Sequence, residues 1–150
     1  MQALAIKKIL CAVDFSQQSE LVARHAVAIA KPFSAALEFL YVCPTLSELG
    51  GHHEVDPKKL RSLEEDIFAG SAGSMDRFIR EQAAGTEATG KVLLGNPAEL
   101  IVQRAKETGA DLIVIGTHGR TGVEHMFFGS VAEKVVRGAT VPVLVTRGQA

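Results

Sequence analysis

The chain has 150 residues, of which 47% are hydrophobic and 22% charged, the proportions of one soluble globular domain with a single large core. Its 16 basic and 17 acidic residues leave a formal net charge of −1, which offers no basic face for nucleic acid. No apolar run approaches the roughly 20 residues of a membrane span, and the N-terminus lacks the features of a signal peptide. We therefore expect one domain over residues 1–150, located in the cytoplasm, that binds neither nucleic acid nor a membrane.

The first third of the chain predicts a strand, a helix and a second strand. Ile9 to Asp14 is a continuous apolar run that ends in a carboxylate, which is typical of a buried parallel strand. Ser16 and Ser19 are suitable caps for a helix that ends near Pro32. Leu37 to Val42 is again apolar and predicts the second strand.

The middle of the chain predicts a loop, a long helix and a third strand. The stretch from Thr45 to Asp56 has the composition of an exposed loop. Apolar residues at helical spacing from Pro57 to Ala84 predict an amphipathic helix, in which Gly70 and Gly73 favour a bend or a break. Thr86 to Leu94 alternates and then becomes apolar, which predicts the third strand.

The last third begins with a strong helix start. Asn96 is a suitable cap, Pro97 occupies the first helical position, and Glu99 completes a capping box, so a helix should run from here to Gly109. The remaining elements are expected to be a strand over Leu112–Ile115, a helix over Ser130–Arg137 and a strand over Val141–Val145.

Alternation of strands and helices along the whole chain predicts the α/β class. The expected architecture is an open, twisted, five-stranded parallel sheet with right-handed crossovers and helices on both faces. Ligands of such sheets bind beyond the carboxyl ends of the strands, where the strand order reverses. Asp14, Val42 and Gly116 end three of the predicted strands, so we expect them to converge there.

A glycine-rich segment connects the fourth predicted strand to the last helix. Gly116 and Gly119 follow the strand, and Gly129 and Ser130 stand at the start of the helix. Glycines let backbone N–H groups approach an anion, and the first turn of a helix offers unpaired donors and a positive dipole end. The segment therefore predicts a site for a nucleotide or a similar phosphorylated ligand; the alternative is a glycine-rich turn without a ligand.

Side chains near this segment match the same kind of ligand. His118 and Arg120 lie inside the glycine loop, where they are candidates for phosphate contacts. The carboxylate of Asp14 accepts hydrogen bonds, so it suits a ribose hydroxyl or an adenine amino group; its alternative role is to cap the helix ahead of Ser19. Val42 is either an apolar wall for a base or an ordinary core residue.

Two other patterns do not support a phosphate or metal site. Gly85 to Lys91 matches most of a Walker A loop, but Val92 replaces the required hydroxyl residue and continues a strand instead of opening a helix. The adjacent His52 and His53 lack the spacing of metal ligands. We therefore expect neither pattern to form such a site.

The sequence contains no recognisable catalytic constellation. It has no nucleophile elbow, no obviously paired carboxylates and no Walker B partner. Cys11 and Cys43 are most simply two buried free thiols. Turnover in the nucleotide pocket would depend on His118, His125 or Asp14, so binding is better supported than catalysis.

The string Gly116-x-x-Gly119-x9-Gly129-Ser130 resembles the nucleotide-binding signature of the universal stress protein family. The resemblance extends along essentially the whole chain. It is also carried by the segments Lys7–Ser16, Leu40–Val42, Gly95–Pro97 and Val141–Val145.

This resemblance implies a cytoplasmic, Rossmann-like protein of the adenine nucleotide alpha hydrolase type that forms a homodimer by pairing its last strands, Val141–Val145. Because the glycine signature is intact, it implies the ATP-binding subclass, with a divalent ion, expected to be Mg2+, on the phosphates. The implied pocket residues are Ala12, Val13, Asp14 and Val42 around the adenosine, and Gly116, Gly119, Gly129 and Ser130 around the ribose and phosphates. His118, Arg120 and Val131 are implied beside these glycines, and Ile115 is implied in the same pocket.

The function implied is that of an ATP-binding module in stress response or signalling. Two alternatives use the same fold: a slow ATPase or nucleotidyl-transfer enzyme with the same pocket, and a dimeric scaffold without a ligand.

Overall fold

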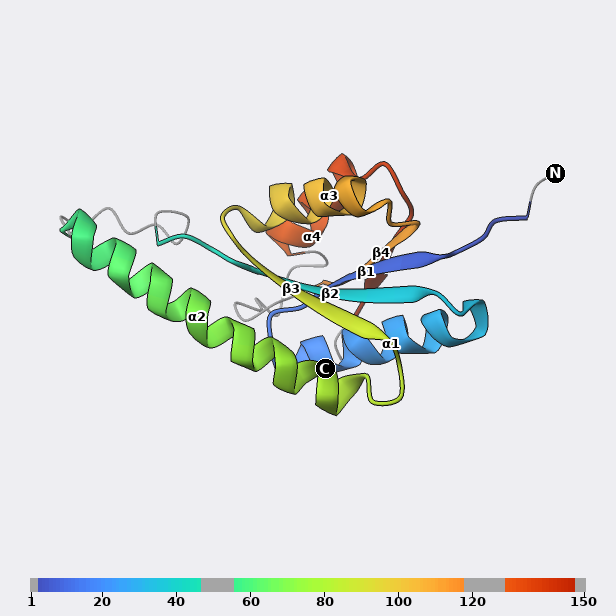
Figure 1. The fold of residues 1–150 in the computed structure, drawn as a ribbon. Helices are drawn as coiled ribbons and strands as arrows, with labels where there is room; N and C mark the ends of the chain where they lie inside the picture. Colours follow the sequence, from blue (N-terminus) through green and yellow to red (C-terminus); the bar gives the residue numbers. More distant parts are fainter. Residues whose placement is uncertain (1–2, 47–55, 118–128, 148–150) are drawn as a thin grey trace.

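Five parallel strands form a sheet at the centre of the molecule (Figure 1). The computed structural model describes residues 3–46, 56–117 and 129–147. The strands of these residues are β1 (Lys8–Ala12), β2 (Ala36–Cys43), β3 (Ala88–Leu94), β4 (Leu112–Gly116) and β5 (Val143–Thr146). Their order in the sheet is β3-β2-β1-β4-β5, and every neighbouring pair is parallel. The predicted α/β class with a five-stranded parallel sheet is confirmed.

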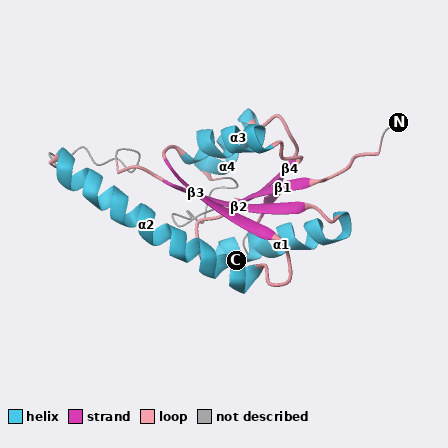
Figure 2. Ribbon diagram, in the orientation of Figure 1, coloured by secondary structure: helices cyan, strands magenta, loops and turns pink. Residues whose placement is uncertain are grey.

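Helices cover both faces of this sheet, as expected (Figure 2). The helices are α1 (Gln17–Phe33), α2 (Pro57–Gln82), α3 (Pro97–Thr108) and α4 (Ser130–Gly138). In β1, Ile9 and Cys11 pack in a core with residues of α1 and α2, whereas Leu10 packs in a second core with residues of α3 and α4. Because successive side chains of a strand point to opposite faces, the continuous apolar strands serve both cores.

The strand order reverses next to β1, and this reversal positions the candidate site. The chain runs outward from β1 to β2 and β3, then crosses back to β4 and β5 on the other side of β1. Cys11 of β1 lies beside Val114 of β4 in the register of this central pair. In open α/β sheets the crevice for a ligand forms at such a switch point, beyond the carboxyl ends of the strands.

The helix caps agree with the local sequence signals. Ser16 caps α1, with its side-chain oxygen accepting from the Ser19 N–H at 3.4 Å. Asn96 caps α3 by accepting from the Glu99 N–H at 3.2 Å. Gly109 ends α3 in the left-handed conformation, with φ of +65°, which glycine adopts without steric cost. These caps are local interactions, which is why the sequence indicates them directly.

Long-range packing corrects one predicted feature of α2. The helix continues through Gly70 and Gly73 without interruption, so the predicted break is wrong. Ser71 and Met75, which flank Gly73, are buried on one face of α2, and Met75 belongs to the core that α2 shares with α1. Burial of this face outweighs the low helix propensity of two glycines.

The strand ends differ from the prediction by one or two residues, and the differences at β1 and β5 bear on the site and on the sheet edge. β1 ends at Ala12, so Asp14 lies two residues beyond the strand instead of at its last position. β5 begins at Val143, not at Val141. Pro142, which has no N–H, precedes β5, and its carbonyl oxygen accepts from the Ile113 N–H at 3.0 Å. Most of the predicted loop over Thr45–Asp56 lies outside the described residues.

The Walker-like string, Gly85 to Lys91, forms a turn followed by a strand, as predicted. Gly85 lies in a turn with φ of +78°, and β3 starts at Ala88 and runs through the rest of the string. A side chain at Gly90 would collide with Met75 and Ile79 of α2. Gly90 is therefore a site of close helix-to-strand packing, and no helix opens after it.

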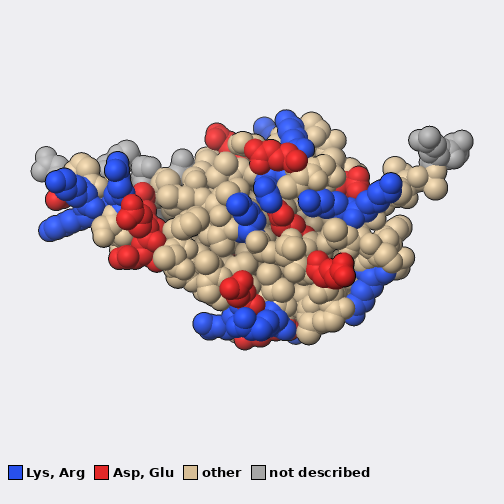
Figure 3. All heavy atoms as spheres, viewed as in Figure 1, with Lys and Arg blue, Asp and Glu red and all other residues tan. Residues whose placement is uncertain are grey.

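The charge distribution on the surface and the character of the described helices agree with the composition of the sequence (Figure 3). Acidic and basic side chains are interspersed over the face that Figure 3 shows, as expected for a net charge of −1. Within the described part of the chain, no helix combines the length and the apolar character needed to cross a bilayer.

The stability of the fold is expected to fall at high pH because of Cys11. Both cysteines are buried free thiols, as predicted, and burial raises the pKa of the Cys11 thiol. Above about pH 8.5 the thiol of the unfolded chain releases its proton, whereas the buried thiol of the folded chain keeps it. Each pH unit above that value therefore lowers the free energy of unfolding by about 1.4 kcal/mol. Below that pH the contribution is fully present.

Urea unfolding at about pH 8 and about pH 10 measures this effect. The free energy of unfolding should fall more steeply with pH in the natural chain than in Cys11→Ala, whose cavity cost does not depend on pH. Equal pH dependence in the two proteins would contradict this assignment.

Candidate functional site

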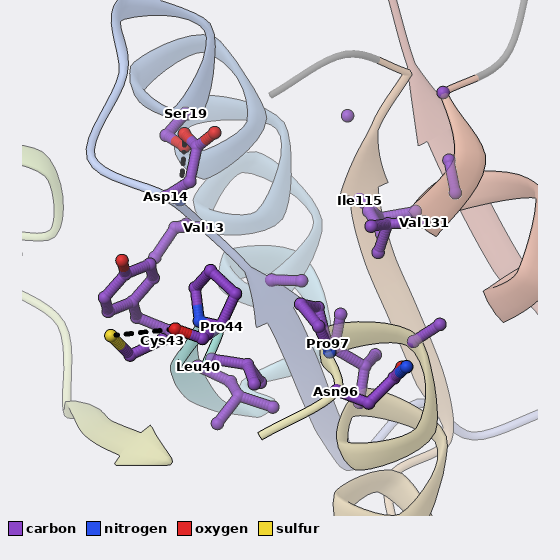
Figure 4. Close-up of a pocket in the computed structure, with 18 of the residues that line it drawn as sticks. Val13, Asp14, Ser19, Leu40, Cys43, Pro44, Asn96, Pro97, Ile115 and Val131 are labelled. Atoms are coloured by element: carbon purple, nitrogen blue, oxygen red, sulfur yellow. Dashed lines mark hydrogen bonds between the residues drawn. The ribbon is translucent and has the colours of Figure 1, made fainter. Parts of the chain in front are cut away.

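A cavity of about 670 Å3 opens at the carboxyl ends of β1, β2 and β4 (Figure 4). Its volume lies in the range of small-molecule sites. The predicted site residues that line it are Ala12, Val13, Asp14, Val42, Ile115, Gly116, Gly129, Ser130 and Val131. His118, Gly119 and Arg120 lie outside the described residues. The structure thus brings together every predicted site residue that it describes.

Apolar side chains from both sides of the strand switch form the walls of the cavity. Figure 4 shows Val13 and Pro44 on one side, and Ile115 with Val131 on the other. Val13 follows β1, Ile115 belongs to β4, and Val131 lies in the first turn of α4. Because these residues also extend the two cores, the walls are held by the packing of the fold. The space between them suits a flat apolar group.

Asp14 lines the cavity and organises the start of α1. Its Oδ1 accepts from the Ser16 N–H at 3.0 Å, from the Ser16 hydroxyl at 2.5 Å and from the Ser19 hydroxyl at 2.7 Å. The buried Ser19 hydroxyl also accepts from the Asp14 N–H at 2.8 Å. The N-cap of α1 is Ser16, and Asp14 supports this cap through the Ser16 N–H and hydroxyl while it also lines the cavity. This network fixes where the carboxylate points.

The N-terminus of α4 lines the cavity beside the end of β4. Gly129 is its N-cap residue and makes no side-chain cap hydrogen bond. The Gly129 N–H donates to the Thr117 carbonyl at 2.7 Å, and the Thr117 N–H donates to the Thr146 carbonyl at 2.9 Å. These bonds tie the start of α4 to the ends of β4 and β5. The first helical N–H groups, beginning with Ser130, have no acceptor within the helix, so this part of the cavity attracts an anion.

Lys134 is a lining residue that the sequence analysis missed. It lies one helical turn after Ser130, and residues four apart share a helix face. Among the described lining residues it is the single Lys or Arg, so it adds the one basic side chain to this part of the cavity lining. Its spacing from Ser130 was a signal that the sequence contained.

Other missed residues come from β2 and the segment after it, from α2 and from the start of α3. They include Tyr41, Cys43, Pro44, Leu46, Glu64, Ile67, Asn96 and Pro97. Asn96 and Pro97 follow a strand end, so the rule for open sheets could have placed them. Glu64 lines the cavity from α2, and its Oε1 accepts from the Leu46 N–H at 3.0 Å. No local signal indicates that contact, because it depends on how α2 packs.

Metal-ligating side chains are not clustered in the described part of the chain. In residues 3–46, 56–117 and 129–147, no three His, Cys, Asp or Glu side chains are grouped so that they could hold a metal ion. His52, His53, His118 and His125 lie outside these residues.

The sequence matches the model of the universal stress protein family over residues 5–147. The chain belongs to this family. One relative, universal stress protein MJ0531 of Methanocaldococcus jannaschii, is 36% identical over 141 residues, which cover 94% of this chain and 82% of the relative. The resemblance seen in the glycine signature is thereby confirmed.

Solved structures of other proteins of this kind share the fold. The structure of universal stress protein MJ0577 of Methanocaldococcus jannaschii matches with a TM-score of 0.83 and 26% identity, covering 97% of this chain and 98% of that one. A universal stress protein of Archaeoglobus fulgidus, solved in complex with dAMP, matches with a TM-score of 0.59 and 27% identity, covering 95% and 98%. This universal stress protein therefore has the Rossmann-like fold of its family.

Proposed function

We propose that this universal stress protein binds an adenine nucleotide, ATP with Mg2+, in the cavity at the carboxyl ends of β1, β2 and β4. The observation that carries the proposal is the combination of groups that line one cavity: the Asp14 carboxylate, apolar walls and the N-terminus of α4. An adenine nucleotide presents hydroxyls, a flat base and phosphates in one molecule. The dAMP complex of the Archaeoglobus fulgidus relative supports this ligand class.

In this arrangement, each part of the nucleotide meets a suitable group. Val13 and Ile115 would flank the base, and Asp14 would accept from a ribose hydroxyl. Gly129 would let the backbone approach the phosphates, which the first N–H groups of α4 would bind, and Lys134 would add a positive charge. Mg2+ commonly binds through substrate phosphates with water completing its shell, which fits a site whose described residues hold no cluster of metal-ligating side chains.

The proposed role is that of a nucleotide-dependent stress-response or signalling module, in which occupancy of the cavity alters a surface that a partner reads. We further propose one domain over residues 1–150, acting in the cytoplasm as a homodimer. The proposal of nucleotide binding is supported by the placement of the described predicted site residues in one cavity.

Calorimetric titration of the protein with ATP and Mg2+ tests the proposal, after any copurified nucleotide has been removed. We expect micromolar affinity, which corresponds to about −8 kcal/mol. Titrations with ADP, AMP and GTP establish which part of the nucleotide is read, and released phosphate reports any hydrolysis. Failure of every adenine nucleotide to bind would overturn the proposal and favour a ligand-free scaffold.

The proposed homodimer forms through β5, the outermost strand on its side of the sheet. The carbonyls of Pro142 and Thr146 accept from the Ile113 and Thr117 N–H groups of the β4 side. Backbone groups alternate in direction along a strand, so those of Val143 and Val145 point away from β4. A second copy of β5 can pair with them across a twofold axis.

Val145→Pro is expected to convert the dimer to a monomer without unfolding it, because it removes an outward N–H that β4 does not use. Light scattering after size exclusion gives the mass. Leu144→Pro is the matched control, since its N–H points toward β4, and it should lower stability by about 3 kcal/mol or more. A Val145→Pro protein that remains dimeric would rule out pairing through β5.

A further inference from the structure

Phe15 has a backbone conformation that its side chain disfavours. Its φ is +64°, in the left-handed region where the Cβ of a bulky residue crowds the carbonyl oxygen. Ser34 is the other non-glycine residue with positive φ in the described part of the chain, and it forms the ordinary left-handed end of α1. Phe15 ends no helix. It lies between Asp14, which lines the cavity, and Ser16, which caps α1.

This left-handed residue turns the chain so that the groups after it meet the residue before it. The Ser16 N–H and hydroxyl and the Ser19 hydroxyl all donate to Oδ1 of Asp14, at 2.5 to 3.0 Å. The direction of the Asp14 carboxylate therefore depends on the turn at Phe15. Glycine would make the same turn without strain, but it would also leave the turn free to adopt other conformations.

Aromatic packing holds the turn in place. The Phe15 ring lies 4.8 Å from the ring of Tyr41 and 5.8 Å from that of Phe78, measured between centroids. Phe78 packs edge-on against Phe39 at 5.4 Å, and both of these rings are buried. Such geometries are favourable for aromatic pairs. The cluster connects the turn to β2 and α2, and Tyr41 itself lines the cavity.

We infer that Phe15 is a positioning residue of the nucleotide site: its ring, held by Tyr41 and Phe78, fixes the left-handed turn and thereby the direction of the Asp14 carboxylate. The inference rests on the proposed function, since Asp14 is the group that would meet the ligand. It assigns to the aromatic cluster a role in affinity that is separate from its role in the core.

A double-mutant cycle of Phe15 and Asp14 tests this inference by calorimetry with ATP and Mg2+. Phe15→Gly is expected to weaken binding about tenfold in the natural background. Asp14→Asn keeps an acceptor oxygen for the turn but loses the carboxylate, and in this background Phe15→Gly should change affinity by less than about twofold. Phe33→Ala, at the half-exposed far end of α1, is the control and should bind like the natural chain.

A second variant keeps the test decisive if Phe15→Gly does not fold. Phe15→Leu retains apolar packing without the aromatic contacts, so we expect a smaller loss of affinity that again disappears in the Asp14→Asn background. Thermal unfolding of each variant confirms that it is folded at the titration temperature.

The outcomes separate the two proposals. If the natural chain binds ATP and Phe15→Gly or Phe15→Leu binds equally well, the positioning role is wrong and the proposed function stands. The same holds if the loss persists unchanged in Asp14→Asn, because the effect would then not act through the carboxylate. If the natural chain binds no adenine nucleotide, the proposed function fails and the positioning role fails with it.

Discussion

Gly129→Val is expected to weaken ATP binding by at least about a hundredfold, or about 2.7 kcal/mol, while the protein stays folded. Gly129 lines the cavity at the N-cap of α4, where the backbone would approach the phosphates of the proposed ligand closely. Its φ of −67° and ψ of 157° are accessible to valine, so the backbone need not move. The added isopropyl group would instead occupy space that the proposed nucleotide needs.

Gly138→Ala is the matched control at the other end of α4. A Cβ at Gly138 would lie 3.5 Å from a methyl group of Val102, an ordinary van der Waals contact. This variant should bind ATP like the natural chain and show a similar or slightly higher unfolding midpoint. Unchanged affinity in Gly129→Val, with a normal unfolding transition, would show that the phosphates do not lie at the N-terminus of α4.

Glu38→Ala is expected to lower the free energy of unfolding by about 1.5 to 3 kcal/mol, because it removes both charge-assisted hydrogen bonds to Arg104, whose side chain is 23% exposed. Glu38 is 7% exposed in β2 and contacts Arg104 of α3 through two hydrogen bonds, Nε to Oε1 at 2.7 Å and Nη2 to Oε2 at 2.9 Å. Hydrogen bonding to Glu38 raises the pKa of Arg104, so the cation persists over the accessible pH range.

The exposed pair of Glu133 and Arg137 provides the comparison. Their atoms lie 2.9 Å apart on the surface of α4, four residues apart in the chain. Glu133→Ala should cost less than about 1 kcal/mol, because water already screens both charges. Urea unfolding of the two variants measures the difference. Equal losses of stability would mean that the Glu38–Arg104 pair contributes no more than a surface contact.

The sequence by itself determined the features that depend on neighbouring residues. Apolar runs indicated each strand, and the caps at Asn96 and Gly109 are made by groups a few residues apart. The order of strands and helices then limited the fold to a parallel α/β sheet, with ligands at the carboxyl ends. For this reason Asp14 and Gly116, far apart in the chain, could be predicted to converge, and both line the cavity.

Only the tertiary structure decided the features that depend on contacts between distant segments. The pairing of Glu38 with Arg104 joins residues 66 positions apart, and no local sequence pattern predicts it. The path of α2 through Gly70 follows from burial of its face, and burial also brings Glu64 to the cavity wall. Phe15 is left-handed because its ring packs on Tyr41 and Phe78, against the preference of its own backbone. In α2 and at Phe15, favourable packing against several segments outweighs a local backbone preference of about 1 kcal/mol.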